Sequence, residues 1–82
     1  MGNMILQNVS LSTNLRRLRN EAHLSKKLLV AKMNILGSPI EHTAYSKIEA
    51  GVRNIKVTDL VALQQIYKVD FGEFFKGIAP HE

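Results

Sequence analysis

Apolar residues recur at spacings of three and four in short segments of this sequence, which is the pattern of amphipathic helices. In the first segment, the residues on one helical face are Leu11, Leu15, Leu18 and Ala22. No segment shows convincing period-two alternation, although residues 5–9 are a candidate for a short extended arm. The pattern predicts an all-α domain of five short helices joined by turns.

A second helix is expected to follow directly. Ser25 is a good N-cap for it, and Gly37 is suited to ending it. The expected inner face repeats the first pattern and consists of Leu24, Leu28, Ala31 and Ile35.

The third helix has the sharpest predicted start. Ser38, Pro39 and Glu41 match an N-cap, a first-turn proline and the glutamate of a capping box. The helix is expected to run to about Ala50, with Gly51 in a left-handed turn. Its expected inner residues are Tyr45 and Ile48, with Ala44 or Glu41. Its expected outer residues are His42, Thr43, Ser46, Lys47 and Ala50.

A connecting loop is expected at residues 52–56, followed by a fourth helix at about 57–67. Its expected inner residues are Leu60, Leu63 and either Ile66 or Tyr67, and its cap is either Thr58 or a residue two positions earlier. Asp70 and Glu73 resemble a second capping box, which would open a short last helix ended by Gly77 and Pro80. At least two of Phe71, Phe74 and Phe75 are expected in the core. The alternative is an apolar dimer surface around Phe74, Phe75 and Ile78.

The composition leaves little room for catalysis. A chain of 82 residues buries a modest core, and the absence of cysteine excludes disulfides, thiolate metal sites and a cysteine nucleophile. The three histidines show no metal-ligand spacing, and no phosphate-binding loop or nucleophile motif occurs. No apolar run reaches the length of a membrane span, and no signal peptide is apparent. We therefore expect a cytoplasmic protein with no enzymatic activity, cofactor, metal or membrane partner.

The positive charge is concentrated in the first two thirds of the chain. Residues 1–56 carry nine Lys or Arg against three Asp or Glu, whereas residues 57–82 carry two against four. Such an asymmetry suits a nucleic acid or an acidic membrane as partner. A solvated basic surface with no partner is the alternative.

Four sequence pieces in this order resemble the lambda-repressor-like, Cro-type helix-turn-helix family, also called the XRE family. They are Leu15-Arg16-Arg17-Leu18-Arg19, Leu24-Ser25-Lys26-Lys27-Leu28, Tyr45-Ser46-Lys47-Ile48-Glu49-Ala50-Gly51, and Arg53-Asn54 before Leu60. The resemblance covers residues 11–78. It leaves residues 1–10 as an N-terminal arm and residues 79–82 as a C-terminal tail.

The resemblance implies that helix two crosses the DNA backbone while helix three lies in the major groove. The matching phosphate-contact positions are Ser25, Lys26, Lys27 and Arg53. The matching base-reading positions are His42, Thr43, Ser46 and Lys47. There are two alternatives to these DNA contacts: Ser25 serves only as a helix cap, and the outer face of helix three is only solvated.

The resemblance also implies a structural ion pair, between Arg19 of helix one and Glu49 of helix three. One departure from relatives is that Ser25 to His42 is about five residues longer. We expect helix two to gain a turn and helix three to gain an early turn starting at Ser38. Glu41 would then either complete the capping box or face a base.

The resemblance finally implies a sequence-specific, double-stranded DNA-binding transcriptional regulator of repressor type, acting as a homodimer. The alternative is an antitoxin or other interaction module that uses the same fold to bind a protein partner.

Overall fold

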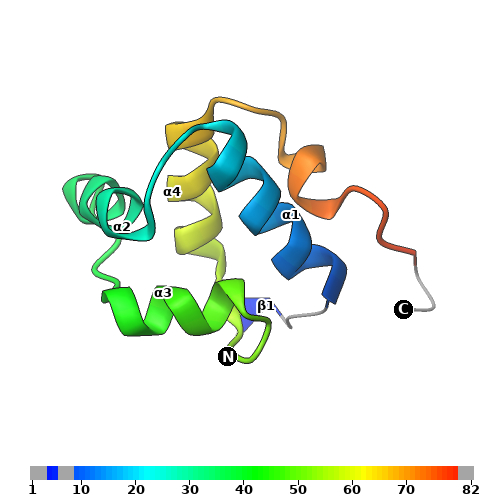
Figure 1. The fold of residues 1–82 in the computed structure, drawn as a ribbon, viewed down its shortest axis with the longest axis horizontal. Coiled ribbons are helices and arrows are strands. Elements are labelled where there is room, and N and C mark those ends of the chain that lie inside the picture. Colours follow the sequence, from blue (N-terminus) through cyan, green and yellow to red (C-terminus); the bar gives the residue numbers. More distant parts are fainter. Residues whose placement is uncertain (1–3, 6–8, 80–82) are drawn as a thin grey trace.

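The computed structural model describes residues 4–5 and 9–79, and it confirms the predicted all-α class. The elements are β1 (Met4–Ile5), α1 (Val9–Glu21), α2 (Lys26–Ile35), α3 (His42–Glu49), β2 (Ile55–Lys56), α4 (Val57–Tyr67) and the 3₁₀ helix η1 (Phe71–Phe75). Helix α4 stands between α2 and α1, with α3 crossing beneath them and η1 beside α1 (Figure 1). The fifth predicted helix is thus a single 3₁₀ segment.

The core is shared by all the helices and by β2. Leu11, Leu15 and Leu18 of α1 are buried as predicted, whereas Ala22 lies beyond the helix end and is exposed. The other core residues come from every remaining helix and from β2: Leu29, Met33, Tyr45, Ile48, Ile55, Leu60, Leu63 and Phe74. Each helix therefore buries one narrow apolar face, as expected for helices that share a small core.

Helix α2 begins and ends as predicted but buries a different face. The Leu28 amide donates to Ser25 Oγ at 3.1 Å, and Gly37 follows the helix with φ at 94°. The buried residues are Leu29 and Met33. Of the predicted inner face only Leu24, which precedes the helix, packs against the core; the rest was wrong, because Leu28 is 47 % and Ile35 84 % exposed, and Ala31 is exposed as well. The helix carries two apolar stripes, and the packing of α2 against α3 and α4 selects the other one.

The predicted start of α3 was also wrong. Glu41 is the N-cap residue, and its side chain makes no capping hydrogen bond within the described part of the chain. Ser38 is buried outside the helix, where its hydroxyl donates to Asp59 Oδ1 of α4 at 2.6 Å. A buried carboxylate needs a donor, and this need outweighs the local capping preference of Ser38.

The added residues between α2 and α3 consequently form a braced loop and not an early helical turn. The Asn34 side-chain amide donates to the carbonyl oxygens of Val30 at 2.8 Å and of Ile40 at 3.0 Å. The Ser38 amide donates to the Met33 carbonyl oxygen at 3.0 Å. The loop is thereby fixed to the end of α2 before α3 begins.

The loop expected at residues 52–56 contains a strand. Ile55 and Lys56 pair antiparallel with Ile5 and Met4, so part of the predicted arm at residues 5–9 is extended. Val9 already belongs to α1, and residues 6–8 lie outside the described part. Helix α4 has the predicted bounds, with Lys56, the earlier of the two alternatives, at its N-cap.

The C-terminal segment departs from prediction in two respects. Asp70 makes no side-chain cap bond to any described residue, and instead its backbone carbonyl accepts from the Glu73 amide at 3.0 Å. Only Phe74 is buried, whereas Phe71 is 44 % and Phe75 40 % exposed. Side chains three apart are eclipsed in a 3₁₀ helix, so Phe71 covers Phe74, with ring centroids 6.3 Å apart, without reaching the core itself.

The bond between Ser38 and Asp59 predicts a coupled loss of stability. Ser38→Ala should lower the free energy of unfolding by about 1–3 kcal/mol, because it leaves a buried carboxylate without its donor. In a double-mutant cycle with Asp59→Ala, urea denaturation should give a coupling energy of at least about 0.5 kcal/mol. Additive effects would mean that Ser38 acts by a route other than this bond, such as a cap.

Candidate nucleic-acid interface

The outer face of α3 is polar and accessible. His42, Thr43 and Lys47 are exposed and Ser46 is half-buried, while Tyr45, Ile48 and Glu49 of the same helix are buried. All four predicted base-reading residues therefore lie on the face that points away from the core. The face offers an ammonium group, an imidazole and two hydroxyls, which are side-chain types that can donate to or accept from base edges.

The candidate phosphate contacts lie at two places. Lys26 is the first residue of α2, where free backbone amides favour an anion, and Lys27 beside it is exposed. The Ser25 hydroxyl is already engaged as the cap of this helix. The cap role of Ser25 is therefore observed, while its phosphate contact stays a prediction; the two lysines lie at a helix end that suits a phosphate.

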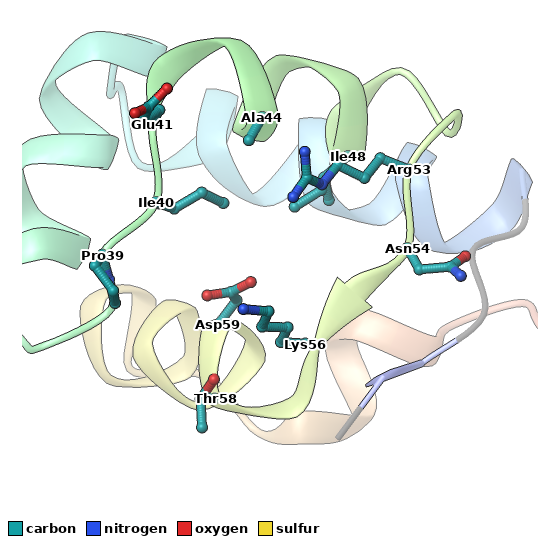
Figure 2. A pocket seen from close by; sticks show the side chains of 10 residues that line it. All are labelled: Pro39, Ile40, Glu41, Ala44, Ile48, Arg53, Asn54, Lys56, Thr58 and Asp59. Atoms are coloured by element: carbon teal, nitrogen blue, oxygen red, sulfur yellow. The ribbon is translucent and has the colours of Figure 1, made fainter. Parts of the chain in front are cut away.

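Arg53 lies at a separate place. It is exposed in the segment after α3, and its side chain reaches back across Ile48 (Figure 2). There it helps to line a pocket of about 300 Å³ between the start of α3, β2 and α4. The pocket also contains the carboxylates of Glu41 and Asp59 and the ammonium of Lys56. Its mixed charges do not make it an anion site.

Arg19 and Glu49 join α1 to α3 through two parallel hydrogen bonds. Arg19 Nε donates to Glu49 Oε2 and Arg19 Nη2 to Glu49 Oε1, each at 2.8 Å. Arg19 Nη1 also donates to the Leu24 carbonyl oxygen at 2.9 Å, in the turn before α2. The two side chains are 15 % and 2 % exposed. Arg19 is thus fully engaged inside the domain, which accords with the structural role expected for it.

The pKa values of this cluster follow from burial and pairing. Burial alone would raise the pKa of Glu49, but Arg19, with smaller contributions from the Tyr45 hydroxyl and Lys26, outweighs it, and the net shift of the pKa is downward. The bond to Glu49 raises the pKa of Arg19. Burial raises the pKa of both Tyr45 and Tyr67, so these phenols stay neutral. The pair is therefore ionised at neutral pH.

The sequence interpretation missed the roles of the other two arginines of α1. Arg16 Nη1 donates to the Glu49 backbone carbonyl at 2.6 Å, so it holds the last residue of α3. Arg17 contacts both Glu21 and Glu73 at 3.3 Å and donates to the Glu73 carbonyl oxygen. Of these contacts, only the one between Arg17 and Glu21 could be predicted from the sequence, because these two residues have the i, i+4 spacing of a helical ion pair. Arg17 and Arg19 are only partly exposed, so they contribute less to the accessible basic surface than the sequence charge indicates, whereas Arg16 remains exposed.

The fold and this exposed helix define a helix-turn-helix domain, in which α2 and α3 pack together and α3 presents a polar outer face. A family model described as helix-turn-helix matches residues 15–74, which is most of the chain. The protein belongs to the lambda-repressor-like, XRE-type helix-turn-helix family, a family of DNA-binding regulators and not of enzymes. No curated protein and no solved structure matches the chain closely.

Each helix within the described residues is too short or too polar to cross a bilayer. In the same part of the chain, no three His, Asp or Glu side chains cluster as metal ligands would.

The ion pair predicts a large cost for removing one partner. Glu49→Gln should lower the free energy of unfolding by about 3–5 kcal/mol, because it leaves a buried guanidinium uncompensated. The matched control is Glu21→Gln, since Glu21 is 62 % exposed and pairs with Arg17 at 3.3 Å. That change should cost less than about 1 kcal/mol. Equal costs in urea denaturation would contradict the structural role of Arg19 and Glu49.

The lowered pKa of Glu49 predicts a pH-dependent part of the stability. The pKa lies below its ordinary value of 4.5 in the folded state, so the stabilisation is complete above that pH. It is lost as the pH falls through the folded-state pKa. The difference in unfolding free energy between wild type and Glu49→Gln should therefore be constant from pH 7 to about 5 and shrink below about 4.5. A difference that grows with acidity would refute this assignment.

Proposed function

We propose that this protein is a sequence-specific, double-stranded DNA-binding transcriptional regulator of repressor type that acts by occupying its site in the cytoplasm. The observation that carries the proposal is the outer face of α3, where His42, Thr43, Ser46 and Lys47 share one accessible surface. The inner face of the same helix is fixed by Arg16 and Arg19. A rigid helix with free polar side chains suits insertion into the major groove.

Under this proposal, base contacts and backbone contacts come from different helices. Lys47 donates to guanine O6 or N7, His42 donates to a similar acceptor, and Thr43 and Ser46 use their hydroxyls. Lys26 and Lys27, with the amide groups at the start of α2, hold a phosphate. Arg53 adds a second backbone contact. Positioning by α2 thereby sets the register in which α3 reads the sequence.

The proposal includes a homodimer on a two-fold site. One short helix makes too few base contacts for tight specific binding, and the half-sites would lie about 34 Å apart or a multiple of that distance. The apolar surface around η1 supports contact between two copies, although the exposed residues are not all those expected from the sequence. Phe74 is fully buried, so the exposed rings are those of Phe71 and Phe75.

Selection from a randomised duplex library at about 150 mM salt tests the function, since non-specific phosphate binding fades as salt rises. Enrichment of an inverted repeat is the expected result. Failure to enrich any sequence, with the protein folded by circular dichroism, would overturn the proposal and favour a function based on a protein partner.

Two lysine variants separate base reading from phosphate binding. Lys47→Ala should relax the base preference at one position of each half-site, because it removes a donor in the groove. Lys26→Ala should weaken binding to all sequences and reduce the slope of log K against log salt by about one unit for each site. Fluorescence anisotropy on the selected site and single-base variants measures both. If both variants lost affinity equally for all DNA sequences, with the base preference unchanged, the base-reading role of α3 would be refuted.

A further inference from the structure

Helix α2 presents an apolar stripe that the domain leaves uncovered. Leu28, Ala31 and Ile35 lie on its outer side, and Ile35 is 84 % exposed. The opposite side already supplies the core through Leu29 and Met33. A second apolar stripe that contains a highly exposed aliphatic residue is typical of a protein-binding helix, because its residues do not contribute to the core.

The stripe leads into a groove. An open groove of about 560 Å³ lies between the end of α2 and α4, and its apolar lining is Ile35, Leu36 and Ile66. Lys32, Gln65 and Lys68 complete it. None of the described residues that line the groove is acidic. The groove therefore combines an apolar lining with two cationic groups.

The charges beside the stripe indicate the kind of partner. The stripe has the three-and-four spacing of the contact positions in a helix pair, and Lys27 and Lys32 occupy the two positions that flank it. In a helix pair these flanking positions face the partner and select it by charge. Helix α2 contains three lysines and no acidic residue. A partner helix with acidic flanking residues would match them.

A second copy of this chain would not match. Parallel pairing of two α2 helices places Lys27 opposite Lys32, and antiparallel pairing places each lysine near its own equivalent. Either arrangement sets like charges against each other while covering the stripe. The homodimer surface at Phe71 and Phe75 lies on η1, on the other side of α4 from α2 (Figure 1).

We propose that the α2 stripe and its groove form a docking site for an acidic amphipathic helix of another protein. Leu28 and Ile35 are the apolar anchors, while Lys27, Lys32 and Lys68 pair with the acidic flanks of the bound helix. This site is separate from the outer face of α3, and it shares only Lys27 with the phosphate contacts proposed for DNA. The proposal therefore does not depend on DNA binding.

A displayed library of helical peptides, with randomised side chains on all faces, tests the site on the full chain. Peptides are selected on wild type and depleted on Ile35→Lys. The expected peptides carry apolar residues at spacings of three and four flanked by Asp or Glu. The best of them, synthesised and titrated calorimetrically, should bind wild type at least tenfold more tightly than Ile35→Lys.

The matched control is Val52→Lys, because Val52 is also a highly exposed aliphatic residue, at 75 %, and lies outside α2. Both variants gain the same charge, so general attraction between a basic protein and an acidic peptide affects them equally. Val52→Lys should bind as wild type does. Lys32→Glu combined with Lys68→Glu should lose at least tenfold in affinity.

Three results would overturn the proposal. One is the absence of any enriched peptide, with wild type folded by circular dichroism. Another is equal binding to Ile35→Lys and Val52→Lys, which would mean that charge alone attracts the peptide. The third is dissociation of a wild-type dimer by Ile35→Lys in sedimentation, which would identify a second copy as the occupant. None of these readouts involves DNA, so a failure of the proposed function would be seen separately.

Discussion

The buried ion pair of Arg19 and Glu49 is the interaction on which the orientation of α3 depends. It joins α1 to α3 by two bonds of 2.8 Å and extends to the Leu24 carbonyl before α2. Arg16 adds a bond to the backbone of the same glutamate. A carboxylate this buried is tolerated only when its charge is compensated, so neither partner can be lost alone. The pair thereby ties α1 and α3 to the turn before α2 while leaving the outer face of α3 unused.

Features determined by short-range spacing were predictable from the sequence, whereas those determined by distant partners were not. The α1 stripe, the Ser25 cap and the bounds of α4 follow from local spacing and capping chemistry. The predicted start of α3 was wrong because the Ser38 hydroxyl donates to Asp59, which lies 21 residues further along the chain. The prediction of the buried face of α2 was wrong because both apolar stripes of this helix have helical spacing. Periodicity alone cannot say which of two apolar stripes will meet the core.

The candidate site illustrates the same division. The outer position of His42, Thr43 and Lys47 follows from the helical period once Tyr45 and Ile48 are placed inside. The distribution of positive charge was harder to predict, since Arg16, Arg17 and Arg19 are all held by partners within the domain. The contact roles assigned to the α2 and α3 residues rest on the family resemblance and remain predictions.

The charges on α2 disfavour self-association through its exposed apolar stripe. A domain of 82 residues needs only a narrow face of each helix for its core, so the outer face of α2 is free to differ. An exposed aliphatic row would ordinarily favour contact with its own copies. The lysines that flank it oppose that contact, because any pairing of two α2 helices brings like charges together. The same lysines attract an acidic helix, so one arrangement of charge both disfavours the wrong occupant and selects the right one.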